Sequence, residues 1–167
     1  MYFNDRKKID NEKIDIIKKR SRIENYIRYL LLNSDYTEVK TPIINRYADI
    51  APITQFIVQS PLESDELYLR IAPTEYLKKL IHYGFEHIFE FSTNFRNDSI
   101  NNNHLFEFTS LEIMDKDKNV YDKMNQTESI IKNCIMFCMD NNFVDENSDF
   151  AKSVSEKWKR IRIVDLF

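Results

Sequence analysis

Hydrophobic residues recur at helical spacing in three stretches of this chain of 167 residues. Over residues 11–32, isoleucine and leucine alternate with charged residues in the pattern of an amphipathic helix. Residues 73–84 repeat that spacing between a proline suited to a first helical turn and the chain's single glycine. Residues 120–142 again offer one apolar face. The pattern therefore predicts three helices.

Elsewhere apolar and polar residues alternate, which is the pattern of half-buried strands. His87–Arg96 and Phe106–Met114 alternate in this way on either side of residues 97–103, a polar, turn-forming run, so a long antiparallel hairpin is expected. The acidic residues 145–149 indicate a loop. Shorter strands are predicted at Tyr36–Lys40, Phe56–Val58 and Leu67–Ile71. This order favours an α+β fold, an antiparallel β-sheet flanked by helices, over a doubly wound nucleotide fold.

Composition narrows the class of protein. One glycine, four prolines and no internal repeat favour a single domain over residues 1–167. A net charge of −3 excludes a general nucleic-acid binder, so any RNA contact must be local. Apolar runs are too short for a membrane span, and the expected location is the cytoplasm. Cys134 and Cys138 are expected to be buried thiols rather than zinc ligands.

The candidate chemistry lies on the predicted hairpin. Arg96 and Glu112 can share one surface, with Asp98, His104 and Phe108 between them. Such a surface suits an anion and a flat ring, because guanidinium donates two parallel hydrogen bonds and an aromatic ring offers a stacking face. The residues alone leave a simpler interpretation open, in which Arg96 and Glu112 form a cross-strand ion pair and Phe108 is a core residue.

Four segments, taken in order, resemble class II aminoacyl-tRNA synthetases, and the lysyl group most. Residues 19–45 are similar to motif 1, a long helix and a strand that ends at Pro42. Residues 67–81 resemble the strand and helix after motif 1. Residues 84–114 resemble motif 2, with FRND in place of the family's FRNE, and residues 158–167 resemble a later segment. The resemblance implies a partial class II catalytic domain and ATP-dependent activation of an amino acid.

The resemblance also implies a role for each matching residue. Arg96 is expected to bind the α-phosphate of ATP and to stabilise the charge that develops there, which makes it the candidate catalytic residue. Asp98 would contact the adenine amino group and His104 the phosphates. Phe108 would stack on adenine. Glu112 would contact the amino group of the amino-acid substrate.

Several positions depart from the family pattern. Thr74 replaces a glutamate that faces the substrate lysine, and Glu75 is its substitute only after a shift of register. Residues 48–51 replace a Gly-Gly-Ala loop, so side chains occupy the approach to the substrate. Asn103 stands for a loop arginine and Met114 for a tyrosine. Selectivity for lysine is therefore in doubt.

No motif 3 and no anticodon-binding domain are recognised in the sequence. Any ATP binding is therefore expected to be weak, Mg²⁺ is expected only if a partner supplies ligands, and tRNA binding is not expected for the chain alone. Motif 1 implies a homodimer through Lys19–Pro42. Three interpretations stay open: a non-catalytic paralogue, one half of a split enzyme that is completed by a partner protein carrying motif 3, and a truncated product without function.

Overall fold

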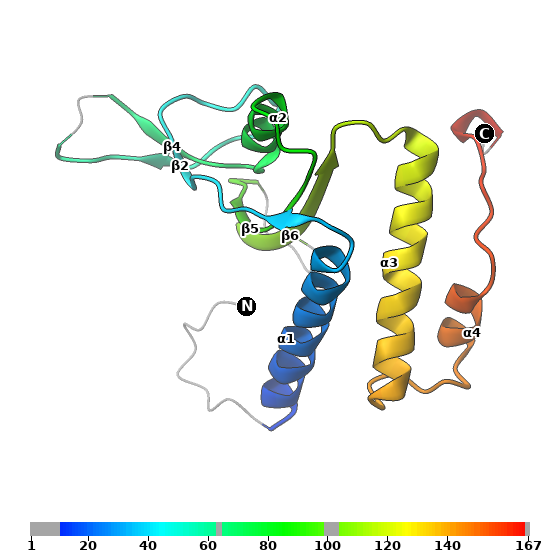
Figure 1. Ribbon diagram of the computed structural model, residues 1–167. Coiled ribbons are helices and arrows are strands. Elements are labelled where there is room, and N and C mark those ends of the chain that lie inside the picture. Colours follow the sequence, from blue (N-terminus) through cyan, green and yellow to red (C-terminus); the bar gives the residue numbers. More distant parts are fainter. Residues whose placement is uncertain (1–10, 63–64, 99–103, 166–167) are drawn as a thin grey trace. The chain divides into compact units, whose positions relative to one another are not determined.

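The computed structural model describes residues 11–62, 65–98 and 104–165 (Figure 1). These residues form two compact units. The first unit holds the described parts of Met1–Leu30 and Asn119–Phe167, and the second holds those of Leu31–Lys118. The tip of the predicted hairpin turn, with Asn103, lies outside the described residues.

The first unit is helical. It contains most of α1 (Asn11–Leu32), together with α3 (Val120–Asp140), α4 (Asp149–Ser155) and a short 3-10 turn at Ile163–Asp165. Helix α3 begins with a capping box: the Asn119 side chain accepts hydrogen bonds from the backbone N–H groups of Tyr121 and Asp122, and Asp122 accepts one from the Asn119 N–H. This reciprocal cap explains why the helix starts one residue after Asn119.

Aromatic stacking joins α1 to α3. The rings of Tyr26 and Phe137 stack with centroids 4.3 Å apart. Arg22 lies over the ring of Phe143, 4.9 Å from its centroid, and this cation–π contact adds to the apolar burial.

Cys138 is buried and Cys134 half-buried on α3, and both are free thiols. Burial raises the pKa of Cys134 to about 11, so its thiol is protonated and unreactive near neutral pH.

Glu128 on α3 holds the segment that follows α4. It accepts hydrogen bonds from the Trp158 N–H at 3.1 Å and from the Arg160 guanidinium at 2.6 Å. It also pairs with Lys132 at 2.8 Å, one helical turn away. These contacts lower the pKa of Glu128 to about 2, with the hydrogen bond from Lys132 contributing most.

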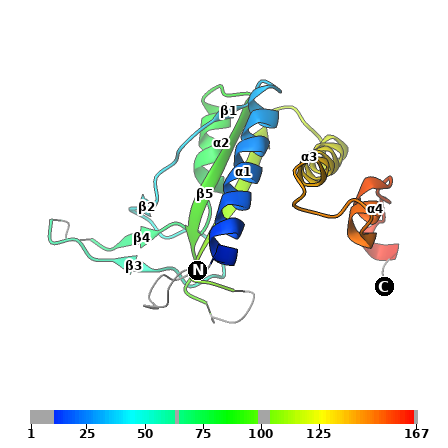
Figure 2. The ribbon, with the colours of Figure 1, turned by 90° about the horizontal axis from the view of Figure 1, so that it is seen from below.

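The described residues of the second unit form two three-stranded sheets and the helix α2 (Figure 2). The first sheet has the order β1-β5-β6, with bounds Thr37–Glu38, His87–Phe95 and Glu107–Asp115. The second has the order β2-β4-β3, with bounds Ile44–Asn45, Leu67–Leu69 and Ile57–Val58. Helix α2 (Thr74–His82) lies against β5 and β6. Leu77 on α2 is fully buried, as are Ile88 and Phe89 on β5.

Glycine ends α2. Gly84 has φ of +112°, a conformation that L side chains rarely adopt. From this position its N–H donates to the carbonyl of Ile81, and the next N–H, of Phe85, donates to Leu80. The prediction of a helix end at the single glycine is therefore confirmed.

The predicted α+β architecture is confirmed, with one refinement. Strands β5 and β6 pair antiparallel over nine residues each, as the alternation indicates. However, β1 runs parallel to β5, so the first sheet is mixed. The two-residue strand β2 was not predicted, because two residues carry no periodicity. Among the described residues no helix is long and apolar enough to cross a membrane.

Candidate functional site

One face of the β5–β6 hairpin is mostly polar from Glu90 onward, whereas the pair of Ile88 and Met114 at its other end is apolar. Because successive side chains of a strand point to opposite faces, alternate residues of β5 meet their register partners of β6 on the same side. The pairs on this face are Glu90 with Glu112, Ser92 with Ser110, and Asn94 with Phe108. Arg96 continues the same alternation just beyond the end of β5. The hairpin therefore brings Arg96, Phe108 and Glu112 to one face.

Arg96 and Phe108 form a pair. The guanidinium carbon of Arg96 lies 5.0 Å from the centroid of the Phe108 ring. The Arg96 N–H donates to the carbonyl of Phe106 at 2.9 Å, which fixes the backbone beneath the side chain. Its Nε is buried and has no hydrogen-bond partner among the described residues. The cross-strand ion pair between Arg96 and Glu112 that the sequence left open does not form.

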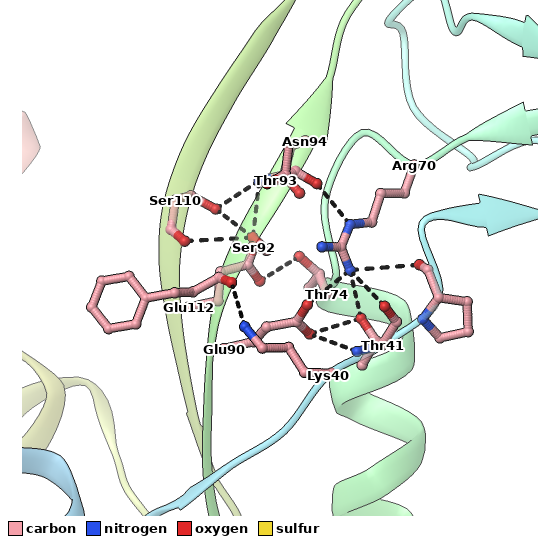
Figure 3. A network of polar contacts seen from close by, with 12 residues as sticks. Lys40, Thr41, Arg70, Thr74, Glu90, Ser92, Thr93, Asn94, Ser110 and Glu112 are labelled. Carbon is pink, nitrogen blue, oxygen red and sulfur yellow. Dashed lines mark hydrogen bonds and ion pairs between the residues drawn. The ribbon is translucent and has the colours of Figure 1, made fainter. Parts of the chain in front are cut away.

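Between Phe108 and Glu112 the same face has a floor of small polar side chains. Figure 3 labels three of them, Ser92, Asn94 and Ser110. The Asn94 Nδ2 donates to Ser92 Oγ at 3.0 Å and to Ser110 Oγ at 2.7 Å. The two serine hydroxyls lie 2.9 Å apart. The Asn94 Oδ1 is buried without a partner among the described residues. This floor separates the cation of Arg96 from the carboxylate of Glu112 by neutral groups.

Glu112 is bound by Thr74 (Figure 3). The Thr74 hydroxyl, on the first turn of α2, donates to Glu112 Oε2 at 2.8 Å. Glu75, the predicted substitute for the family's glutamate, is exposed and pairs with Lys78 at 2.9 Å instead. In this register Thr74, rather than Glu75, contacts Glu112.

A buried ion pair lies beside Thr74 (Figure 3). Arg70 Nη1 and Glu90 Oε1 are 2.9 Å apart, and their side chains are 3% and 1% exposed. The Thr41 hydroxyl donates to Glu90 Oε2 at 2.7 Å and accepts from Arg70 Nη1 at 2.8 Å. Arg70 Nε donates to the Thr93 carbonyl at 2.9 Å. These contacts tie the chain after β1, the end of β4, and β5 together.

The remaining predicted site residues are less enclosed. Asp98 and His104 are both exposed, on the two sides of the hairpin tip. Their roles toward a nucleotide stay predictions.

The loop that replaces the family's glycine loop is held by Asp49. The Asp49 Oδ2 accepts hydrogen bonds from the Ile71 N–H at 3.1 Å and from Gln55 Nε2 at 3.2 Å. Ile50 is fully exposed. The Asp49 side chain therefore fastens its own loop to the end of β4.

The Arg70–Glu90 pair and the Thr74–Glu112 contact were not predicted. The signal for the first was one arginine in an otherwise apolar strand, since a buried charge requires a partner. The partner itself could not be chosen, because Glu90 lies 20 residues away and only the fold brings the two together.

The sequence of the chain matches the family of class II tRNA synthetases (D, K and N) over residues 6–166. Because this match covers almost the whole chain, the chain belongs to that family. Its α+β fold is consistent with a partial class II synthetase core.

Within that family the chain resembles lysine–tRNA ligases. It is 40% identical to the lysine–tRNA ligase of Buchnera aphidicola subsp. Schizaphis graminum over 126 residues, 75% of this chain and 25% of that enzyme. It is 37% identical to the enzyme of the Acyrthosiphon pisum subspecies over 159 residues, 94% of this chain and 31% of that enzyme. The Thermotoga maritima enzyme is 34% identical over 160 residues, 94% of this chain and 31% of that enzyme. The chain therefore spans about a quarter to a third of these relatives.

Proposed function

We propose that this chain is a lysine–tRNA ligase-like module that keeps a weak adenine-nucleotide site and a dimer scaffold, but does not activate an amino acid with its own residues. The observation that carries the proposal is the placement of Arg96 over Phe108, on the same face as Glu112. A guanidinium suits phosphate oxygens, and the adjacent ring suits a base. The Arg96 Nε is buried without a partner among the described residues, and it is therefore a candidate donor to a ligand oxygen.

Around Glu112 the face offers few groups that could bind the ammonium group of an amino acid. Glu112 is its carboxylate, and one oxygen already accepts from Thr74. An ammonium ion has three donors to satisfy and loses hydration in a cleft, so a single remaining carboxylate oxygen holds it poorly. In the described part of the chain no group of three His, Cys, Asp or Glu side chains suits a metal ion.

Calorimetric titration with ATP tests the nucleotide site. We expect weak binding that Arg96→Ala reduces roughly tenfold to a hundredfold, because a hydrogen bond from a charged group contributes about 1.5 to 3 kcal/mol. Arg20→Ala is the matched control, since Arg20 is exposed on α1 and pairs with Glu24. ATP binding that is equally strong in both variants would place the nucleotide elsewhere.

Lysine-dependent pyrophosphate exchange tests the catalytic half of the proposal. We expect background exchange by the isolated chain, with Arg96→Ala indistinguishable from the unaltered protein. Activation requires the carboxylate, ATP and the ammonium group to be fixed together. Exchange that depends on both lysine and Arg96 would contradict this proposal.

One half of a split enzyme is the second candidate, and the retention of Arg96 and Glu112 on one face favours it. Its test adds a polypeptide that spans the rest of the Buchnera aphidicola relative. Exchange that appears only in the mixture, and that Arg96→Ala removes, would favour the split enzyme over the non-catalytic module.

A further inference from the structure

The end of the β5–β6 hairpin that carries Arg96 is joined to the short segment from Thr54 to Phe56. The Asn97 N–H, next to Arg96, donates to the Thr54 carbonyl at 2.9 Å. On the opposite strand, the ring of Phe106 meets the ring of Phe56 edge-on, with centroids 5.3 Å apart and ring planes at 86°. Both strands at this end are therefore held by one segment from outside the hairpin.

Phe106 is the cross-strand neighbour of Arg96. The Arg96 N–H donates to the Phe106 carbonyl at 2.9 Å, and the two residues continue the strand register one step beyond Phe95 and Glu107. Because alternate residues of a strand share a face, Phe106 and Phe108 lie on the same face as Arg96. Phe106 is bonded to Arg96 and is two residues from Phe108, so a displacement of Phe106 would disturb the contact between them.

The segment that holds the hairpin end is itself fastened to β4. The Phe56 carbonyl accepts from the Leu69 N–H at 3.0 Å. Gln55, the residue before Phe56, donates from Nε2 to the Leu69 carbonyl at 3.1 Å and accepts from the Asp49 N–H at 2.7 Å. Phe56 is also half-buried. The ring of Phe56 is therefore anchored on β4 where it contacts Phe106.

We propose that Phe56 is a positioning residue, whose edge-on contact with Phe106 keeps the hairpin end in the arrangement that places Arg96 against Phe108. Phe56 acts through Phe106 rather than through a contact with a ligand. The effect on ligand binding rests on the proposed nucleotide site. A binding arrangement that is populated only part of the time lowers the apparent affinity by that fraction. An edge-to-face aromatic pair is strong enough to change the population roughly threefold to tenfold.

Amide hydrogen exchange measured by NMR tests the positioning role without any ligand. Phe56→Leu removes the ring edge, so the N–H groups of Arg96 and Asn97 should exchange roughly threefold to tenfold faster. Phe56→Tyr keeps the ring and should restore slow exchange. The Leu77 N–H, which donates to the Pro73 carbonyl in α2, should be unaffected. An equal increase at Leu77 would mean a general loss of stability and would overturn the proposal.

Phe106→Leu removes the other ring and is the second variant, in case Phe56→Leu fails to fold. It should speed exchange at the same N–H groups, and combining the two changes should add little, because they break the same contact. Phe143→Leu is the matched control. Phe143 is half-buried and meets Phe137 edge-on in the first unit, so its substitution should leave exchange at Arg96 unchanged.

Calorimetric titration with ATP connects the positioning role to the proposed nucleotide site. We expect roughly threefold to tenfold weaker ATP binding in Phe56→Leu, and normal binding in Phe56→Tyr and Phe143→Leu. ATP binding that Phe56→Leu leaves unchanged would overturn the proposal, as would unchanged exchange at Arg96. If none of these proteins binds ATP while Phe56→Leu still speeds exchange at Arg96 and not at Leu77, the nucleotide site is contradicted and the positioning role is supported.

Discussion

The Thr74 hydroxyl donates a hydrogen bond to Glu112 across the gap between the first turn of α2 and strand β6, over 2.8 Å. The contact fixes the half-buried carboxylate on the polar face. Thr74→Val keeps the shape of the side chain and removes the donor, so we expect the free energy of unfolding to fall by about 1 kcal/mol. Thr74→Ser keeps the hydroxyl donor and should therefore retain most of the stability of the unaltered protein. Urea denaturation measures the free energy of unfolding of the two variants and of the unaltered protein. Equal values for all three proteins would mean that the hydrogen bond to Glu112 does not contribute to stability.

Breaking the Arg70–Glu90 pair should strongly destabilise the second unit. Removing one partner of a buried ion pair leaves a buried charge alone, so Arg70→Met should cost roughly 3 to 5 kcal/mol. Adding Glu90→Met should cost less than the sum of the two single changes. Guanidinium denaturation of all four proteins gives the coupling free energy. Lys78→Met removes an exposed pair and is the control, with an expected cost below about 1 kcal/mol. Additive costs for Arg70 and Glu90 would contradict the pairing.

Acid should loosen the contact between α3 and the segment after α4. The pKa of Glu128 is lowered from 4.5 to about 2, so its stabilising contribution is complete above about pH 4.5 and is lost as the pH falls toward about 2. Trp158, the chain's single tryptophan, donates to Glu128 and reports on this contact by fluorescence. Glu128→Gln should remove most of the change in fluorescence over that range.

Glu75→Gln is the control for this titration. The pKa of Glu75 is also lowered, chiefly by Lys78, but Glu75 belongs to the other unit. Its substitution should leave the tryptophan signal unchanged. The same acid transition in Glu128→Gln as in the unaltered protein would assign that transition to another carboxylate.

The predicted homodimer through Lys19–Pro42 is best tested at exposed positions. Ile27 and Val39 are both half-buried within the chain's own fold, so a charge at either would also disturb folding. Tyr29 and Leu32 are 62% and 54% exposed. If they lie in the dimer interface, Tyr29→Glu combined with Leu32→Glu should convert the dimer to a monomer, because burying a carboxylate in an apolar interface is costly.

Light scattering coupled to size exclusion measures the mass. Tyr121→Glu places the same change on an exposed residue of α3, outside the predicted interface, and should leave the dimer intact. A monomer before any substitution, at micromolar concentration, would contradict the motif 1 interpretation.

Long periodic elements were predictable from the sequence and short or non-local features were not. The alternation over β5 and β6 and the helical spacing of α1 each run over many residues, so each signal repeats. The face that carries Arg96, Phe108 and Glu112 followed from that alternation. The position of strand β2 and the hydrogen bond between Thr74 and Glu112 depend on contacts between distant parts of the chain. No local sequence pattern predicts such contacts. The sequence shows that Thr74 replaces the family's glutamate, but only the structure shows that its hydroxyl donates to Glu112.

The position of Arg70 couples segments that are distant along the chain. Its side chain meets Thr41, Glu90 and Thr93, which lie 20 to 29 residues away along the chain. A partly folded chain that buried β5 before β4 arrived would enclose the Glu90 carboxylate without its counter-ion, at a cost of several kcal/mol. Such intermediates are therefore penalised. The ion pair therefore disfavours partly folded states of the second unit in which β5 is buried and β4 is misplaced.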